Sequence, residues 1–88
     1  METQFRESFT KDLRKIRDKS LLKRVEGIIE TVEQARRLEE VPSIGKMPGW
    51  KRYYRIEVGD YRIGVAVDSN VVTFIRFLHR KDIYRDFP

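Results

Sequence analysis

The sequence contains no cysteine and only one histidine, and both shortages limit its chemistry. Without cysteine the chain has no disulfide and no thiolate nucleophile. One histidine leaves too few nitrogen ligands for a zinc site built by the protein alone. We therefore expect any catalysis to use oxygen and nitrogen acids and bases, with no metal and no cofactor.

Hydrophobic runs are short as well. No window approaches the roughly 18 consecutive apolar residues of a membrane span, and the first residues lack the apolar core of a signal peptide. These absences favour a cytoplasmic protein with no membrane partner. With 88 residues, the chain is small enough to bury only about 60% of its unfolded surface. We expect a single domain over residues 1–88 and no large enclosed substrate cavity.

Charge, by contrast, is abundant. Charged residues make up 38% and hydrophobic residues 40% of the chain, a balance typical of a soluble globular domain with a thin core. The formal net charge of +5 favours polyanionic partners such as nucleic acid, acidic proteins or anionic membranes. Charge alone does not separate such binding from a role in solubility.

The first half of the chain shows helical periodicity after a short predicted strand at Glu2 to Phe5. A first helix is predicted from about Ser8 to Arg17 with Ser8 or Thr10 as its N-cap, and Ser20 is predicted to cap a second helix. The apolar stripe of the second helix consists of Leu21, Leu22, Val25, Ile28, Ile29 and Val32. Residues 36–49 lack periodicity and contain prolines and glycines, so we interpret them as a connection.

From residue 53 onward the period of the apolar residues changes to two, which indicates strands. Three strands are predicted, over about residues 53–58, 61–68 and 71–78, with turn-forming residues between them. The third strand is apolar on both faces, as a central strand would be. The sequence therefore predicts an α+β fold in the order β-α-α-β-β-β, with two N-terminal helices packed on one face of a small, mainly antiparallel sheet. The other face is expected to be open.

Strand alternation places cations and small residues together on that open face. When the apolar positions point to the helices, Arg55, Glu57 and Arg62 point away from them, beside the small Gly64 and Ala66. We expect a shallow, positively lined depression there. For each strand taken alone, an ordinary solvated sheet face with Arg55 and Glu57 paired is the better explanation.

The last dozen residues shift this balance, because they follow the third strand directly. His79, Arg80 and Lys81 come immediately after that strand, and Tyr84 follows three residues later. An imidazole titrates near neutral pH, and arginine binds phosphate through two parallel hydrogen bonds. Beside the depression, and with Arg76 added by strand alternation, these side chains would supply proton transfer and charge stabilisation for chemistry on a phosphodiester.

RNA suits such a set because it carries its own nucleophile, the 2′-hydroxyl, which needs only to be placed in line with the adjacent phosphorus. Glu57 and His79 are both candidates for the base that removes the 2′ proton. Arg62 and Arg80 are candidates for stabilising the charge on the phosphorane oxygens. Tyr84 would protonate the leaving 5′ oxygen or stack on a base.

A simpler explanation of the same segment stays open. Ile83 and Phe87 are predicted to anchor it, while His79 would be a solvated loop imidazole and Tyr84 a partly buried ring beside the anchors. The catalytic candidates are Arg55, Glu57, Arg62, His79, Arg80 and Tyr84, and the candidates for substrate binding are Arg76, Lys81 and Arg85.

Three segments carry a resemblance to a known family: Tyr54-Arg55-Ile56, Gly59-Asp60-Tyr61-Arg62-Ile63-Gly64 and His79-Arg80-Lys81-Asp82-Ile83-Tyr84. Together with the two amphipathic helices and the apolar third strand, they make nearly the whole chain similar to the RelE/ParE superfamily of toxin–antitoxin toxins, and most closely to RelE-like mRNA endonucleases. The resemblance implies that Arg55, Arg62, Arg80 or Lys81, and Tyr84 act on the mRNA phosphate. It places His79 where relatives with a histidine acid or base carry theirs. Glu57 departs from the pattern, since the best-known members have lysine there, and it permits a carboxylate base.

The same resemblance implies a toxin that cleaves mRNA on the ribosome without a metal and so inhibits translation. Its implied partners are a cognate antitoxin that masks the basic face, the ribosome and mRNA. The superfamily also contains toxins that poison DNA gyrase and have no nuclease activity, and fold does not separate the two branches. A ParE-like, gyrase-directed toxin and a noncatalytic nucleic-acid-binding module are therefore the alternatives.

Overall fold

The structure, a computed structural model, describes residues 1–49 and 51–88, which contain three α-helices, one 3₁₀ turn and five strands. In chain order these are β1 (Glu2–Phe5), α1 (Glu7–Arg14), α2 (Lys19–Gln34), η1 (Leu38–Glu40), β2 (Ile44–Lys46), β3 (Tyr53–Val58), β4 (Tyr61–Asp68), β5 (Val71–His79) and α3 (Ile83–Asp86). The predicted α+β class is confirmed. Within the described residues, no helix has the length and apolar composition that a membrane crossing requires.

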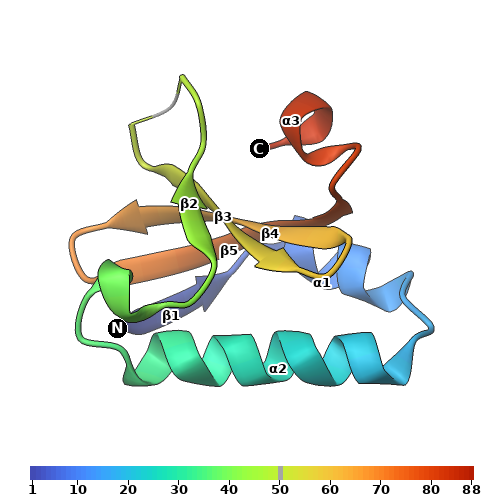
Figure 1. The fold of residues 1–88 in the computed structure, drawn as a ribbon, viewed down its shortest axis with the longest axis horizontal. Helices are drawn as coiled ribbons and strands as arrows, with labels where there is room; N and C mark the ends of the chain where they lie inside the picture. The colour runs from blue at the N-terminus through green and yellow to red at the C-terminus, as the bar shows by residue number, and fades with distance from the viewer. Residues whose placement is uncertain (50) are drawn as a thin grey trace.

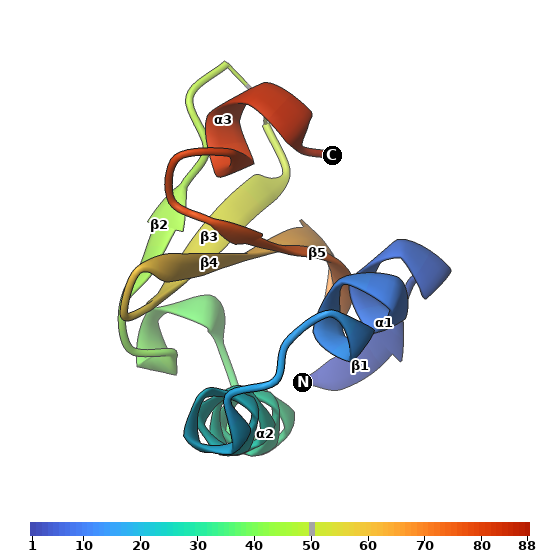
Figure 2. The same ribbon diagram turned by 90° about the vertical axis from the view of Figure 1, so that its right-hand side faces the viewer.

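The strands form one sheet in the order β1-β5-β4-β3-β2. Neighbours among β2, β3, β4 and β5 are antiparallel, whereas β1 runs parallel to β5 with Glu2 opposite Val71. β5 therefore lies inside the sheet, which agrees with its apolar residues on both faces. Helix α2 runs along one face, α1 lies beside β1 and β5, and α3 lies on the opposite side of the sheet from α2 (Figure 1, Figure 2).

Both long helices begin differently from the prediction. Helix α1 starts at Glu7 and its N-cap residue, Arg6, makes no side-chain cap. The Ser8 hydroxyl instead donates to the carbonyl of Ile75 on β5, at 2.6 Å. Helix α2 is capped by Asp18 rather than by Ser20, because the Asp18 carboxylate accepts the backbone N–H groups of Ser20 and Leu21 at 3.0 and 3.2 Å. Hydrogen bonds from the Ser20 hydroxyl and from this backbone lower the pKa of Asp18.

The main core lies between the two long helices and the sheet. Phe9 of α1 and Val25 of α2 are almost fully buried there against β3, β4 and β5. Helix α2 contributes the stripe that its periodicity predicts, since Val25 and Val32 lie two turns apart on one side. The strand residues of this core are Ile56, Val58, Ile63, Val65, Val72, Phe74 and Phe77.

The opposite sheet face, here called the tail face, is partly covered, so the prediction of an open face is wrong. After β5 the chain turns back over the sheet and forms α3 (Figure 2). Ile83 and Phe87 are 0% and 6% exposed, which confirms that they anchor this segment. They belong to a second apolar cluster that consists of Met47, Ala66, Ile75, Ile83 and Phe87.

The predicted connection between residues 36 and 49 contains the turn η1 and the strand β2. β2 pairs antiparallel with β3, with Ile44 opposite Ile56, and so adds an edge strand to the sheet. Three residues with a glycine in the middle show no alternation of apolar side chains, so this strand is not predictable from its sequence pattern.

Candidate functional site

A row of alternating glycine and arginine residues crosses the tail face. By register, Gly45 of β2 lies opposite Arg55 of β3, Arg55 opposite Gly64 of β4, and Gly64 opposite Arg76 of β5. Each of the two glycines leaves room for a neighbour: a Cβ at Gly45 would overlap the Arg55 guanidinium, and a Cβ at Gly64 would overlap the ring of Phe87. The expected open depression at residue 64 is therefore filled by Phe87, and that prediction is wrong.

Arg55 and Glu57 lie on the tail face, two residues apart on the same strand. Nη2 of Arg55 is 4.0 Å from Oε2 of Glu57, which is the ion pair that an ordinary sheet face predicts. At this length and exposure such a pair adds little stability. The Glu57 side chain is 50% exposed, against 24% for Arg55. A solvent-accessible carboxylate thus lies beside a half-buried cation.

Arg62 lies directly opposite Glu57 in the β3–β4 register. Its Nη1 donates to the carbonyl oxygens of Gly59 and Tyr61, at 2.9 and 2.8 Å, which fixes the guanidinium against the turn between the strands. Both acceptors are neutral, and among the described residues no carboxylate forms an ion pair with Arg62. The positive charge of Arg62 is therefore oriented but not neutralised.

The end of β5 meets the same turn. The Arg80 backbone N–H donates to the carbonyl of Asp60 at 2.8 Å, and its Nη1 is 3.9 Å from Oδ1 of Asp60. Both side chains are more than half exposed, so this ion pair is weak and its partners are free to rearrange. Arg62 and Arg80 thus both contact the same two-residue turn, Gly59-Asp60.

His79 lies elsewhere. It is opposite Tyr61 in the register, with its ring edge-on to the tyrosine ring at a centroid distance of 5.4 Å. Tyr61 stacks on Phe77 and packs against the main core, so this imidazole is on the helix side of the sheet and Arg62 on the tail face. Nδ1 of His79 accepts the backbone N–H of Lys81 at 3.2 Å.

The remaining candidates are on or next to α3. Tyr84 is 57% exposed, and no hydrogen bond joins its hydroxyl to another described residue. Lys81 is also exposed. Arg85, by contrast, pairs with Asp82 at 2.9 Å and Asp86 at 3.2 Å, and its hydrogen bond with Asp86 raises the pKa of Arg85 and lowers that of Asp86. The charge of Arg85 is therefore balanced within its own helix.

Comparison with known proteins decides the family. The family of ParE toxins of type II toxin–antitoxin systems (parDE) matches residues 3–84 of the chain. The chain belongs to the RelE/ParE superfamily of toxins. This toxin is also 40% identical to Toxin RelE3 of Methanocaldococcus jannaschii over 89 residues, a match that covers 100% of both chains.

Solved structures agree with this assignment. The toxin superposes with a TM-score of 0.82 on a chain of the RelB-RelE antitoxin-toxin complex from Methanococcus jannaschii, at 40% identity over 97% of this chain and 99% of that one. The archaeal RelE-RelB complex from Pyrococcus horikoshii OT3 gives a TM-score of 0.71 at 22% identity, over 90% and 93% of the chains, and shows the shared fold. The toxin is therefore RelE-like.

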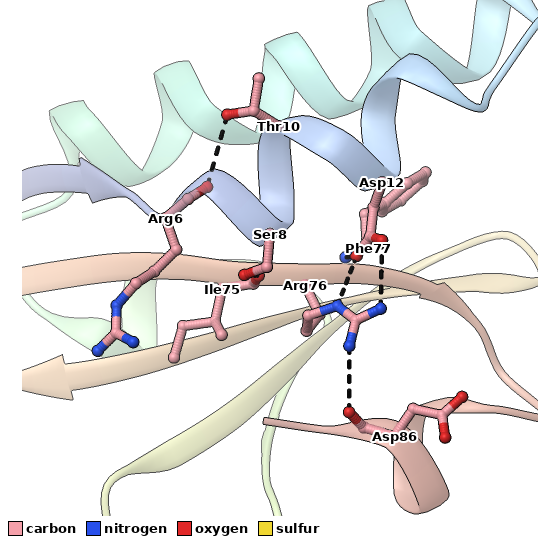
Figure 3. Close-up of polar contacts among 8 residues, drawn as sticks. All are labelled: Arg6, Ser8, Thr10, Asp12, Ile75, Arg76, Phe77 and Asp86. Carbon is pink, nitrogen blue, oxygen red and sulfur yellow. Dashed lines mark hydrogen bonds and ion pairs between the residues drawn. The ribbon is translucent and has the colours of Figure 1, made fainter.

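Sequence reasoning missed a buried carboxylate that binds one of the candidate residues of the toxin. Asp12 of α1 is 6% exposed and accepts hydrogen bonds from Nε and Nη2 of Arg76, at 2.8 and 3.2 Å, and from the backbone N–H of Phe77 at 2.9 Å (Figure 3). The hydrogen bond that Arg76 donates to Asp12 raises the pKa of Arg76. Nη1 of Arg76 donates to the carbonyl of Asp86 at 3.2 Å. Arg76 thus connects α1 to the C-terminal segment, and Asp12 balances its charge.

A signal for Asp12 was present in the sequence. It follows Phe9 by three residues and so lies on the apolar side of α1, where a charged side chain requires a partner. Gly45 and Asp60, which contact Arg55 and Arg80, gave no comparable signal because both lie in segments that look like ordinary turns.

Proposed function

We propose that this toxin is a ribosome-dependent endoribonuclease that cleaves mRNA without a metal and thereby inhibits translation. The observation that carries the proposal is the state of Arg62: its guanidinium is fixed by two neutral carbonyls, carries an uncompensated charge and lies opposite an accessible carboxylate, Glu57. A structural arginine on a sheet face would be expected to pair with such a carboxylate. An arginine left charged and oriented is suited to an anionic ligand.

The proposed reaction uses the 2′-hydroxyl of the mRNA as the nucleophile. The 2′ oxygen forms a bond to the adjacent phosphorus, the bond from phosphorus to the 5′ oxygen breaks, and the products are a 2′,3′-cyclic phosphate and a 5′-hydroxyl. Glu57 is the proposed base, because it shares the tail face with Arg62, whereas His79 lies on the helix side. Arg62 and Arg80 stabilise the charge on the nonbridging oxygens.

Tyr84 is the proposed group for the leaving oxygen or for stacking on a base of the mRNA. Its exposure, and the absence of a hydrogen bond from its hydroxyl to any other described residue, support either role. Arg55 and Lys81 add positive charge around the phosphate. Arg76 and Arg85 are left out of the proposed site, because Asp12 balances the first and Asp82 and Asp86 balance the second.

The proposed partners follow from the relatives. The complexes from M. jannaschii and P. horikoshii hold RelE-type toxins with RelB antitoxins, so we propose a cognate antitoxin for this toxin as well. A small open site orders little substrate by itself, so the ribosome is proposed to present the mRNA and the activity to occur in the cytoplasm.

A triple variant, Arg62→Ala with Arg80→Ala and Tyr84→Phe, tests the proposal. Induction of the wild-type toxin without antitoxin should stop growth and yield new mRNA 5′ ends in primer extension, and the folded triple variant should do neither. Arg17→Ala is the matched control, since it removes an exposed arginine from the α1–α2 loop. Full toxicity of the folded triple variant would contradict the proposal.

A second experiment separates the two candidate bases. The rate of cleavage by wild type should fall as pH drops and the base is protonated, and Glu57→Gln should abolish this acidic limb while His79→Ala retains it. The reverse result would assign the base to His79.

A gyrase-directed toxin is the second candidate function, and the observation that favours it is the match to the ParE family. Inhibition of supercoiling by purified gyrase, together with intact mRNA, would support it. Salt-dependent binding to RNA without cleavage or toxicity would indicate a noncatalytic binding module instead.

A further inference from the structure

Gly64 is the starting point, because its backbone does not explain why it is glycine. Its φ angle lies outside the left-handed region that favours glycine, unlike Gly49 and Gly59, and it sits within β4, where glycine weakens a strand. What the missing side chain provides is space: any Cβ at this position would overlap Cδ1 and Cε1 of Phe87. Gly64 therefore forms a notch in the tail face that receives the Phe87 ring.

Phe87 and Ile83 together determine the orientation of α3 about its own axis. They are four residues apart, which places them on one side of a helical turn, and both are buried on the tail face. The Phe87 ring also meets Tyr53 edge-on, at a centroid distance of 5.1 Å. A helix of four residues is not stable by itself, so these contacts set its orientation. Tyr84, next to Ile83 in the chain, is thereby directed away from the sheet and into solvent.

Arg76 also holds the C-terminal end of α3, next to Phe87. Its Nη1 holds the carbonyl oxygen of Asp86, the last residue of the helix, while Asp12 holds Nε and Nη2 (Figure 3). Because the acceptor on α3 is a backbone atom, this hydrogen bond restrains the main chain of α3 and not only a side chain. The arginine is itself fixed by a buried carboxylate, so its position is well determined.

We propose that Gly64, Phe87 and Arg76 are positioning residues for Tyr84. The Phe87 ring in the notch at Gly64, and Arg76 on the carbonyl of Asp86, hold α3 in the orientation that places Tyr84 at the mRNA phosphate. This inference rests on the proposed function, in which Tyr84 acts on the mRNA. None of the three residues touches the substrate. Their effect on the reaction is through the placement of Tyr84, and a displacement of about 1 Å can lower a rate about 100-fold.

Two opposite changes to the notch test the inference. Gly64→Ala fills it and Phe87→Ala empties it, and both should release α3 without altering the main core on the other face of the sheet. Each should lower the single-turnover rate of cleavage of ribosome-bound mRNA about 100-fold while leaving the half-saturating ribosome concentration nearly unchanged. Phe87→Leu, which keeps an apolar anchor, should recover most of the rate. Phe5→Ala, which truncates a half-exposed ring on β1, is the matched control and should keep the wild-type rate.

A second readout does not depend on activity. With 3-fluorotyrosine in place of tyrosine, the fluorine resonance of Tyr84, assigned through Tyr84→Phe, should shift and sharpen in Gly64→Ala and Phe87→Ala but not in Phe5→Ala. An unchanged resonance, or a cleavage rate within about twofold of wild type once α3 is released, would overturn the inference. If wild type itself cleaves no mRNA, the proposed function fails, and the fluorine spectra still decide whether the notch places Tyr84.

Discussion

Replacing Asp12 by alanine should destabilise the toxin more than the loss of any exposed carboxylate. Asp12 is 6% exposed and accepts three hydrogen bonds, two from Arg76 and one from the backbone N–H of Phe77. Alanine removes all three acceptor contacts at once. Arg76, whose side chain is 23% exposed, can turn partly toward water, but the Phe77 N–H is buried and has no other acceptor among the described residues.

The expected cost follows from these two losses. An unpaired buried N–H costs about 1–3 kcal/mol. A charge-assisted hydrogen bond contributes about 1.5–3 kcal/mol, and we use the lower half of that second range because Arg76 is partly solvated. Asp12→Ala should therefore lower the free energy of unfolding by about 2.5–5 kcal/mol. That is a large part of the total, since a domain of this size is stable by about 4–13 kcal/mol. Asp12→Asn keeps an acceptor for Phe77 and should cost about half as much.

Urea unfolding followed by circular dichroism at pH 7 measures these differences. The double variant with Arg76→Ala completes a thermodynamic cycle, and the cost of the two changes together should fall short of the sum of the single costs by at least about 1 kcal/mol. A loss below about 0.5 kcal/mol for Asp12→Ala, or additive single costs, would refute the view that this carboxylate is a buried structural partner of Arg76.

Three further outcomes are expected. Asp18→Asn should lower the melting temperature at pH 7, because hydrogen bonds from Ser20 and the backbone hold the folded pKa of Asp18 below its unfolded value. The charged cap therefore stabilises the fold fully above the unfolded pKa. In thermal melts, the advantage of wild type over the variant should shrink as pH falls through the folded pKa. Gly45→Ala should displace the Arg55 guanidinium and reduce mRNA cleavage with little loss in stability, as measured by primer extension and urea unfolding; wild-type cleavage would show that Arg55 needs no fixed position. Gly59→Ala should cost about 1 kcal/mol in urea unfolding because φ is +58° there, and an unchanged midpoint would contradict it.

Elements with a long period could be predicted from the sequence. The stripe of α2 and the alternation of β3 and β4 each extend over several residues, and the structure confirms both elements. β2 and α3 are three and four residues long, too short to show a period, and only their packing partners make them regular. The capping residue of α2 was missed by two positions because Asp18 and Ser20 are both good caps.

The candidate site was predictable only as far as strand alternation reaches. Arg55, Glu57 and Arg62 lie on one face as the pleat requires. The register shift near Gly64, which leaves Ile75 without a partner on β4, could not be deduced from either strand alone. His79 is the last residue of β5, one residue past the predicted end of that strand, and its side of the sheet follows from its register opposite Tyr61, against which its ring packs edge-on.

The parallel pairing of β1 with β5 has a consequence for how this domain assembles during synthesis. β1 finds its hydrogen-bonding partners about 70 residues later in the chain, and α1 likewise depends on β5 through Ser8 with Ile75 and Asp12 with Phe77. Contacts between residues this distant in sequence must offset the entropy lost when almost the whole chain closes into a loop. The first fourteen residues therefore stay without their strand partner until β5 has left the ribosome, and a product truncated before residue 71 offers them α2 but not the edge of β5.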